Sequence, residues 1–248
     1  SIVIGITDTG NDFTHPDLFN NVKRNYADVN DGLDNDGDGF TDNYMGWDLG
    51  ENDADASWNA NAHGVHVSGL SSASADNNLG GAGTGFNCKF LPVKIADATG
   101  ALTQAYEGIK YAADHGCQII NCSWGGGGSS QFGQDIIDYA TINKNALVVC
   151  AAGNNGVDGD FYPAAYNYVL SVANTSQNDV KFSNSNYGYM VDVCAPGDNV
   201  NSTWPGSFYI TTSGTSMSSP VVAGAAGIVK NHFPSYNGLQ VGERLKVT

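Results

Sequence analysis

Short apolar stretches rich in β-branched residues recur along the chain and alternate with longer segments of mixed apolar and polar residues. Continuous apolar runs of this kind are typical of strands that are buried on both faces of a sheet. The longer segments have the pattern of helices, and several end at a glycine, such as Gly116, which favours a helix C-terminus. The predicted strands cover residues 1–7, 88–96, 118–124, 146–152 and 168–174, and the predicted helices cover residues 63–75, 102–116, 129–145 and 215–233.

The alternation of strands and helices predicts an α/β fold of three layers, in which a mostly parallel central sheet carries helices on both faces. The 248 residues suit a single domain, residues 1–248. Ser1 leads directly into the first strand, and the final VGERLKVT resembles the start of another element. We therefore expect a domain that is truncated at both ends relative to a longer precursor. We expect no membrane span, because no apolar run reaches about 18 residues.

Acidic residues outnumber basic ones, with 25 Asp and Glu against 10 Lys and Arg and a net charge of −15. This charge would repel nucleic acids and anionic membranes, so neither is a predicted partner. Part of the excess is local, because eight aspartates and no Lys or Arg lie from Asp28 to Asp53. Carboxylates at this density repel one another unless a cation lies among them.

The five cysteines have spacings that match neither a zinc site nor a disulfide framework. Three of them, Cys122, Cys150 and Cys194, lie in apolar, strand-like runs. We expect these three to be small buried apolar side chains. One disulfide that includes Cys117 remains open from the sequence alone.

Polar residues follow several predicted strands at their carboxyl ends, where ligands bind in open parallel sheets. Asp8 comes directly after the first predicted strand, Ser123 lies at the end of the strand 118–124, and Asn154 follows the strand 146–152 after one glycine. One predicted helix opens with His63, and another opens with the hydroxyl-rich stretch GTSMSSP, which contains Ser216. A serine hydroxyl becomes a nucleophile when a neutral imidazole takes its proton, a carboxylate orients that imidazole and an amide stabilises the oxyanion. The collected side chains therefore predict nucleophilic acyl transfer.

The segments GITDTG, THPDL, HGVHVSG, INCSWGG, AAGNNG and SGTSMSSPVVAGAA resemble, in this order and over essentially the whole chain, those of subtilisin-like serine proteases, the subtilase family. The resemblance implies a subtilisin-like fold and a serine endopeptidase. It implies that Asp8 orients the base, His63 is the general base, Asn154 binds the oxyanion and Ser216 is the nucleophile. Ser216 would also direct its own N–H toward the oxyanion from a helix N-terminus.

Several neighbours of these residues are expected to be structural. Pro220 is expected in the first turn of its helix, where a missing N–H leaves no acceptor unpaired. Val65 stands where the family usually has Thr, and we expect activity to survive this change because no catalytic group is lost. The other residues to which we assign capping or packing roles are His15, His66, Thr215, Ser218 and Ser219.

An extended peptide can bind by adding itself as a strand to an exposed edge. By the resemblance, the residues that end the predicted strand 118–124 form the main edge, and segment 97–102 forms the opposing one. Glycines at the main edge would let the substrate backbone come close. By the same resemblance, Gly153 with Gly125 and Gly126 would wall the pocket for the side chain that precedes the cut bond. We interpret Gly127 and Gly128 as an ordinary turn. The residues assigned to substrate binding are Ser123, Trp124, Gly125, Gly153 and Gly100.

The stretch NDGLDNDGDGFTDN predicts a calcium loop, because Ca²⁺ takes six to eight oxygens from closely spaced carboxylates. The spacing follows an EF-hand loop, except that Met45 replaces the closing Glu and no EF-hand helices flank it. A solvated acidic turn is the alternative, and Asp17 matches a ligand of a different calcium site in some relatives. The predicted ligands are Asp34, Asp36, Asp38, the carbonyl of Phe40 and Asp42, with water, Asp31 or Asp48 as candidates to complete the shell.

The leading interpretation is a secreted, monomeric endopeptidase that acts on protein or peptide substrates after removal of a pro-segment. A ligase or cyclase that passes the acyl group to an amine would use the same triad. A calcium-binding structural domain on an inactive protease scaffold would lack a triad residue, and none is missing. The sequence leaves the side-chain preference at the cut bond open.

Overall fold

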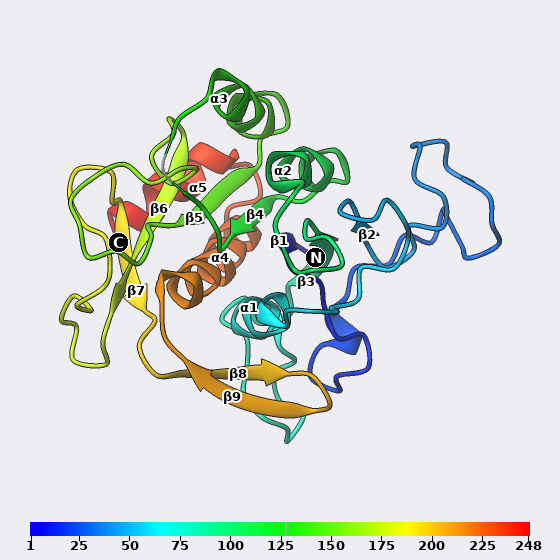
Figure 1. The fold of residues 1–248 in the computed structure, drawn as a ribbon, viewed down its shortest axis with the longest axis horizontal. Coiled ribbons are helices and arrows are strands. Elements are labelled where there is room, and N and C mark those ends of the chain that lie inside the picture. Colours follow the sequence, from blue (N-terminus) through cyan, green and yellow to red (C-terminus); the bar gives the residue numbers. More distant parts are fainter. Residues whose placement is uncertain (127) are drawn as a thin grey trace.

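The computed structural model describes residues 1–126 and 128–248. Its centre is a seven-stranded sheet in the order β2-β3-β1-β4-β5-β6-β7, in which every neighbouring pair is parallel (Figure 1). Parallel neighbours need long crossover connections, which accounts for the helices between strands. The strands of this sheet are β1 (Val3–Asp8), β2 (Trp47–Asp48), β3 (Lys89–Lys94), β4 (Ile119–Cys122), β5 (Leu147–Ala151), β6 (Val169–Thr175) and β7 (Val193–Pro196), and a separate hairpin is formed by β8 (Val200–Trp204) and β9 (Phe208–Thr212).

Helices cover both faces of the sheet and confirm the predicted three layers. On one face, α2 and α3 bury residues such as Ile109 and Ile137 in one apolar core. On the other face, α1, α4 and α5 bury residues such as Leu70, Ala223 and Val241 in a second core. None of the helices that the structure describes combines the length and apolarity needed to span a bilayer. The helices are α1 (His63–Ser72), α2 (Ala105–Asp114), α3 (Gln131–Asp138), α4 (Thr215–His232) and α5 (Gly238–Lys246), with short turns η1 (Phe19–Asn21) and η2 (Tyr139–Asn143).

The β8–β9 hairpin lies outside the main sheet, beside α1 (Figure 1), and two buried histidines hold it there. Nε2 of His15 lies 3.1 Å from the carbonyl oxygen of Phe208, and Nε2 of His66 lies 3.2 Å from that of Ile210. Because a carbonyl oxygen only accepts, both rings carry a proton on Nε2 and donate it. These contacts fit the structural role that the sequence suggested for both histidines.

Pro220 lies in the second turn of α4, so its predicted place in the first turn was wrong. Proline has no N–H, and a residue at this position of a helix would normally donate to the carbonyl of Ser216. That carbonyl instead accepts a hydrogen bond from the Ser123 hydroxyl at 2.8 Å. A side chain from another element therefore fills the gap that the proline leaves.

All five cysteines are free thiols. Cys122 and Cys150 lie in register on β4 and β5 and are buried, as predicted. The prediction for Cys194 was wrong, because β7 is the last strand of the sheet and Cys194 is exposed there. Cys117 is a buried thiol, and burial raises its pKa to about 12, so it stays protonated.

Candidate active site

Asp8 and His63 form a pair at the carboxyl end of the sheet. Asp8 is the last residue of β1, and His63 is the first residue of α1. Nδ1 of His63 lies 2.9 Å from Oδ1 and 3.1 Å from Oδ2 of Asp8. The Asp8 side chain is 4% exposed, whereas that of His63 is 30% exposed. Because an ionised carboxylate only accepts, Nδ1 carries a proton and Nε2 is left to take another.

The local backbone holds this pair in place. The N–H of Thr9 donates to Oδ1 of Asp8 at 2.8 Å, and the Thr9 hydroxyl accepts from the N–H of Gly64 at 3.0 Å. A Cβ atom on Gly64 would lie only 2.4 Å from the carbonyl oxygen of Gly10, so the residue after His63 must be glycine. Burial opposes a charge on His63, but the charge and hydrogen bond of Asp8 outweigh it, and the pKa of His63 is raised above 6.5.

Ser216 lies in the first turn of α4 and contacts the segment that follows β4. Its hydroxyl donates to the carbonyl oxygen of Ser123 at 3.1 Å. The neighbouring hydroxyls of Ser218 and Ser219 are buried, and both donate to acceptors inside the core. Ser218 and Ser219 therefore pack, as predicted, while Ser216 lies at the partly exposed start of the helix.

Asn154 follows β5 and lies beside the start of α4. Its Oδ1 accepts from the N–H and the hydroxyl of Thr215, at 2.8 and 3.1 Å. The Thr215 hydroxyl also accepts from the N–H of Gly153 at 3.1 Å. Since Oδ1 is the end held by the protein, the Nδ2 group of Asn154 is the donor left for a ligand. Thr215 thus orients the amide, a role that the sequence analysis missed.

The main predicted substrate edge follows β4 and continues to Gly126, which forms an antiparallel bridge with Tyr162. The Trp124 side chain turns away from this edge toward α2. Its Nε1 donates to the Thr7 hydroxyl at 3.0 Å, and its ring meets that of Tyr106 edge-on. The backbone of Trp124 is therefore the part that a substrate can use.

The predicted edge glycines have different surroundings. Gly100 has φ +84° and lies in a turn between Ala96 and Leu102, which are bridged. Gly125 and Gly153 both adjoin the ring of Phe161, a residue that the sequence analysis did not single out. Gly128 has φ +110°, as a turn allows, and Gly127 lies outside the described residues.

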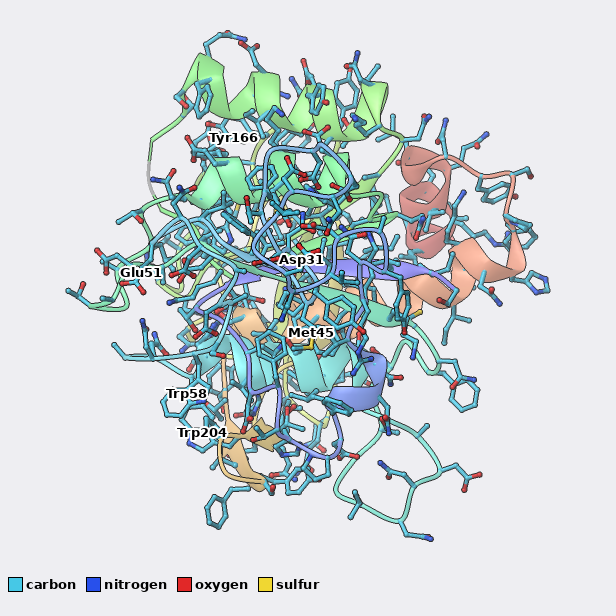
Figure 2. The ribbon with its side chains drawn as sticks, turned by 90° about the vertical axis from the view of Figure 1, so that its right-hand side faces the viewer. Asp31, Met45, Glu51, Trp58, Tyr166 and Trp204 are labelled. Atoms are coloured by element: carbon cyan, nitrogen blue, oxygen red, sulfur yellow. The ribbon has the colours of Figure 1, made fainter. Side chains whose placement is uncertain are left out.

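The acidic loop lies on the side of the protein that faces the viewer in Figure 2, where Asp31 is labelled. Carboxylate oxygens of Asp28, Asp34 and Asp36 lie within 4.8 Å of one another. Two Ca²⁺–oxygen bonds together span about 5 Å, so these three groups fit one calcium ion. Asp28 is buried and precedes the EF-hand-like spacing, which is why the pattern did not include it.

The other predicted ligands contact protein groups. Oδ2 of Asp38 lies 2.8 Å from Nε2 of His115. The ring of Phe40 packs edge-on against the same histidine, at 5.6 Å between centroids. Asp42 accepts hydrogen bonds from the backbone N–H groups of Asp31 and Gly32, each at 2.9 Å. Asp28 and Asp34 accept backbone hydrogen bonds in the same way, so these contacts do not distinguish ligands from other carboxylates, and Asp38, the Phe40 carbonyl and Asp42 stay predicted ligands.

Two further aspartates that the sequence offered as ligands are buried among protein donors. Asp48 forms an ion pair with the buried Lys94 at 2.6 Å, although burial is the largest influence on its carboxyl and raises its pKa. Asp17 accepts from the Asn77 amide at 2.5 Å and from the Tyr209 hydroxyl at 2.8 Å. Asp48 is therefore separate from the acidic loop, whereas Asp17 ties the hairpin to the segment that follows α1.

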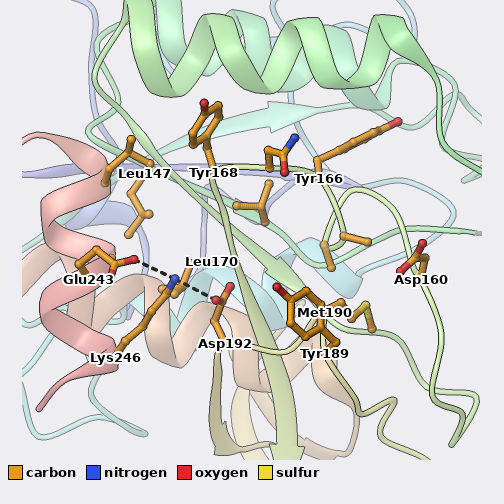
Figure 3. Close-up of a pocket in the computed structure, with 16 residues that line it drawn as sticks. Leu147, Asp160, Tyr166, Tyr168, Leu170, Tyr189, Met190, Asp192, Glu243 and Lys246 are labelled. Atoms are coloured by element: carbon orange, nitrogen blue, oxygen red, sulfur yellow. Dashed lines mark hydrogen bonds and ion pairs between the residues drawn. The ribbon is translucent and has the colours of Figure 1, made fainter.

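A cavity of about 570 Å³ opens between β6 and α5 (Figure 3). Lys246 bridges Asp192 and Glu243 across it, at 2.9 Å to each carboxylate. None of the predicted catalytic or substrate-binding residues lines this cavity. It is therefore distinct from the candidate active site.

Comparison with known proteins agrees with this geometry. The model of the subtilase family matches residues 1–248. Thermitase from Thermoactinomyces vulgaris is 39% identical over 239 residues, which are 96% of this chain and 77% of thermitase. A thermophilic serine proteinase from Bacillus sp. strain AK1 is 38% identical over 247 residues. These residues are 99% of this chain and 55% of that proteinase.

Two solved structures have the same fold over the whole chain. A protease from Pseudoalteromonas arctica superposes with a TM-score of 0.84 at 30% identity, covering 100% of this chain and 83% of that one. A cold-adapted subtilisin-like serine proteinase superposes with a TM-score of 0.80 at 27% identity, covering 100% and 81%. The chain belongs to the subtilase family of serine endopeptidases.

Proposed function

We propose that this chain hydrolyses peptide bonds through an acyl-enzyme on Ser216. The observation that carries the proposal is the contact of the buried Asp8 carboxylate with Nδ1 of His63, at 2.9 Å, which leaves Nε2 as a base. Nε2 takes the hydroxyl proton as Oγ of Ser216 attacks the substrate carbonyl carbon, and Asp8 stabilises the resulting imidazolium. His63 then gives the proton to the leaving amine, and a water molecule releases the acyl group by the same route.

The Ser216 hydroxyl donates to Ser123 before substrate binds, so it rotates about Cα–Cβ toward His63 for the attack. The tetrahedral intermediate places negative charge on the former carbonyl oxygen. Nδ2 of Asn154 and the N–H of Ser216 at the start of α4 are the donors proposed for that oxygen. Thr215 holds the amide of Asn154 in the orientation that this role requires.

The proposed substrate is a protein or peptide in an extended conformation. Its backbone would pair with the edge that includes Ser123, Trp124 and Gly125 and with the opposing segment 97–102, which contains Gly100. Gly153 would lie beside the side chain that precedes the cut bond. No observation favours transfer of the acyl group to an amine over hydrolysis.

We also propose that Asp28, Asp34 and Asp36 hold a calcium ion that stabilises the loop. Bound calcium would offset the repulsion among these carboxylates and supply no group to the reaction. Residues 1–248 are proposed as one catalytic domain that acts as a secreted monomer after loss of a pro-segment. Plentiful calcium outside the cell would keep even a weak site filled.

The test is labelling with a fluorophosphonate, followed by mass spectrometry and analysis of peptide products. Label is expected on Ser216, and Ser216→Ala is expected to abolish both labelling and hydrolysis. Ser218→Ala is the matched control, because this neighbouring hydroxyl is buried, and it should keep both. Label on Ser218 or Ser219 would contradict the assignment, and joined rather than cleaved peptides would favour the transferase.

A further inference from the structure

Phe161 lies beside Gly125 and Gly153, two of the three glycines that are expected to wall the pocket for the side chain that precedes the cut bond. A Cβ atom placed on Gly125 would lie 2.4 Å from Cε1 and 3.0 Å from Cδ1 of the Phe161 ring. A Cβ atom placed on Gly153 would lie 2.9 Å from Cγ and 3.0 Å from Cδ2 of the same ring. One edge of the ring therefore faces Gly125 and the other faces Gly153. The ring occupies the space that the two glycines leave between them.

The backbone around Phe161 is fixed by hydrogen bonds. The next residue, Tyr162, donates its N–H to the carbonyl of Gly126 at 2.7 Å and accepts from the N–H of Gly126 at 2.8 Å. The Phe161 carbonyl accepts from the N–H of Ala165 at 2.9 Å. The segment that carries the ring is thus bound directly to the proposed substrate edge. The ring cannot leave the pocket by a shift of the backbone unless these bonds break.

The walls of the pocket are also held. The amide of the buried Asn186 donates to the carbonyl of Ala152 at 2.9 Å and accepts from the N–H of Asn155 at 2.9 Å. Its Nδ2 lies 2.4 Å from the position of a Cβ on Gly153. The Asn186 amide therefore holds the segment that contains Gly153 in place. Neither wall is positioned to move outward and make room for a large side chain beside the ring.

We propose that Phe161 is a specificity-determining residue that fills the bottom of this pocket and restricts cleavage to bonds that follow a small residue, such as Gly, Ala or Ser. This inference rests on the proposed function, since it assigns the side-chain preference of the same site. A methyl group can lie on the face or edge of the ring, whereas the ring of a substrate Phe would overlap it. The Phe161 ring also offers no opposite charge to an acidic or basic side chain of the substrate.

The experiment uses fluorogenic peptides that are identical except for Gly, Ala, Leu or Phe on the acyl side of the cut bond. The protein is expected to prefer Ala over Phe by roughly 100-fold in kcat/KM. Phe161→Ala and Phe161→Gly should raise kcat/KM for the Phe peptide by about 10- to 100-fold and so reduce the preference for Ala over Phe. Phe132→Ala removes an exposed phenylalanine on α3 and should change neither value.

A graded series makes the result independent of any single variant. Phe161→Leu, Phe161→Val and Phe161→Ala should admit progressively larger side chains, and each variant can be checked for folding by its melting temperature. Equal cleavage after Ala and Phe by the unaltered protein would overturn the proposal while leaving the protease function intact. Unchanged preference in folded Phe161→Ala protein would overturn it as well.

A binding measurement separates this inference from the proposed function. On a Ser216→Ala background, calorimetry compares peptides that end in Ala or Phe at the carboxylate. Phe161→Ala should increase affinity for the peptide ending in Phe by about tenfold or more and should not increase affinity for the peptide ending in Ala. If the chain hydrolysed nothing, the mechanism would fail, but this gain in affinity would still support the role of Phe161, and its absence would refute it.

Discussion

Ser216 and Ser123 exchange hydrogen bonds: the Ser216 hydroxyl donates to the Ser123 carbonyl at 3.1 Å, and the Ser123 hydroxyl donates to the Ser216 carbonyl at 2.8 Å. The second bond gives a donor to a carbonyl to which Pro220, four residues later in α4, has no N–H to donate. The edge that would hold the substrate is thereby joined to the residue that would attack it. A shift of either segment is transmitted to the other through two short polar contacts.

Ser123→Ala is expected to lower the free energy of unfolding by about 1 kcal/mol, since it leaves the Ser216 carbonyl without a donor. Pro220→Ala supplies an N–H for the same carbonyl, so Ser123→Ala should cost less in that background. Urea unfolding of both single variants and the double variant, all carrying Ser216→Ala to prevent self-digestion, measures the coupling. If the changes in the free energy of unfolding were strictly additive, the Ser123 hydroxyl and the N–H at position 220 would not serve the same acceptor, the Ser216 carbonyl.

Asn154→Ala is expected to lower kcat by about 10²–10³-fold with little change in KM, because its amide acts mainly in the transition state; the magnitude is that known for subtilisin. Thr215→Val keeps the shape but removes the hydroxyl that donates to Asn154, and it should lower kcat about tenfold. Steady-state kinetics on one peptide gives both values. Loss of substrate binding with kcat retained would contradict the oxyanion role.

The acid limb of kcat/KM is expected above pH 6.5, because His63 must be neutral to act as a base and its pKa is raised by Asp8. Asp8→Asn removes the negative charge and should lower the pKa of His63, which NMR titration of Ser216→Ala protein can follow. Asp135→Asn, on the exposed side of α3, is the control and should leave it unchanged. A pKa of His63 that does not fall in Asp8→Asn would exclude the carboxylate as its cause.

Acid is expected to destabilise the fold through His66. Burial lowers the pKa of His66 to about 4, whereas the unfolded chain titrates near 6.5. Between these values the unfolded state binds more protons, so stability falls by up to about 3 kcal/mol as pH drops from 6.5 toward 4. His66→Gln should reduce this slope, while His232→Gln, at the exposed end of α4, should keep it. Denaturant unfolding at several pH values makes the comparison.

Calcium at a hundredfold excess over its Kd is expected to stabilise the protein by about 2.7 kcal/mol. Asp36→Asn removes one of the three clustered carboxylates and should reduce the difference in stability with and without calcium. Using that difference cancels any effect of the substitution on the metal-free protein. Asp135→Asn should leave it unchanged. Calorimetry that finds the same stoichiometry and affinity in Asp36→Asn would place the ion elsewhere, with Asp17 as the next candidate.

The main strands and helices could be predicted because burial on both faces requires continuous apolar runs, as in β1 and β5. The β8–β9 hairpin could not, because β9 is largely exposed and its residues carry no strict alternation of apolar and polar side chains. Its position depends in part on buried histidines that donate to the carbonyl groups of Phe208 and Ile210, and in part on the hydroxyls of Ser202 and Thr203, which donate to backbone carbonyls of α1. Every residue has a backbone carbonyl, so a contact made by a carbonyl oxygen cannot be predicted from the pattern of side chains.

The predicted catalytic residues stood out because each comes directly after a strand or begins a helix. Asp28 and Phe161 lie near residues that were found, but the contacts that bring them there cross irregular segments. Asp28 approaches Asp34 and Asp36 through a loop, and Phe161 meets Gly125 and Gly153 from the irregular segment between β5 and β6. Spacing along the chain cannot predict such distances, because loops lack a fixed rise per residue.

The position of Asp8 also sets how the protein would lose activity on heating. It ends β1, which pairs along its length with β3 on one side and β4 on the other. Central strands of this kind are expected to exchange their amide hydrogens only when the whole domain opens. The starts of α1 and α4 are packed as well, because Gly64 adjoins the Gly10 carbonyl and Thr215 is buried. His63 is hydrogen-bonded to Asp8, and Ser216 is hydrogen-bonded to the segment that follows β4, so the three side chains are expected to keep their places until the domain unfolds. Loss of activity on heating is then expected to coincide with global unfolding rather than to precede it.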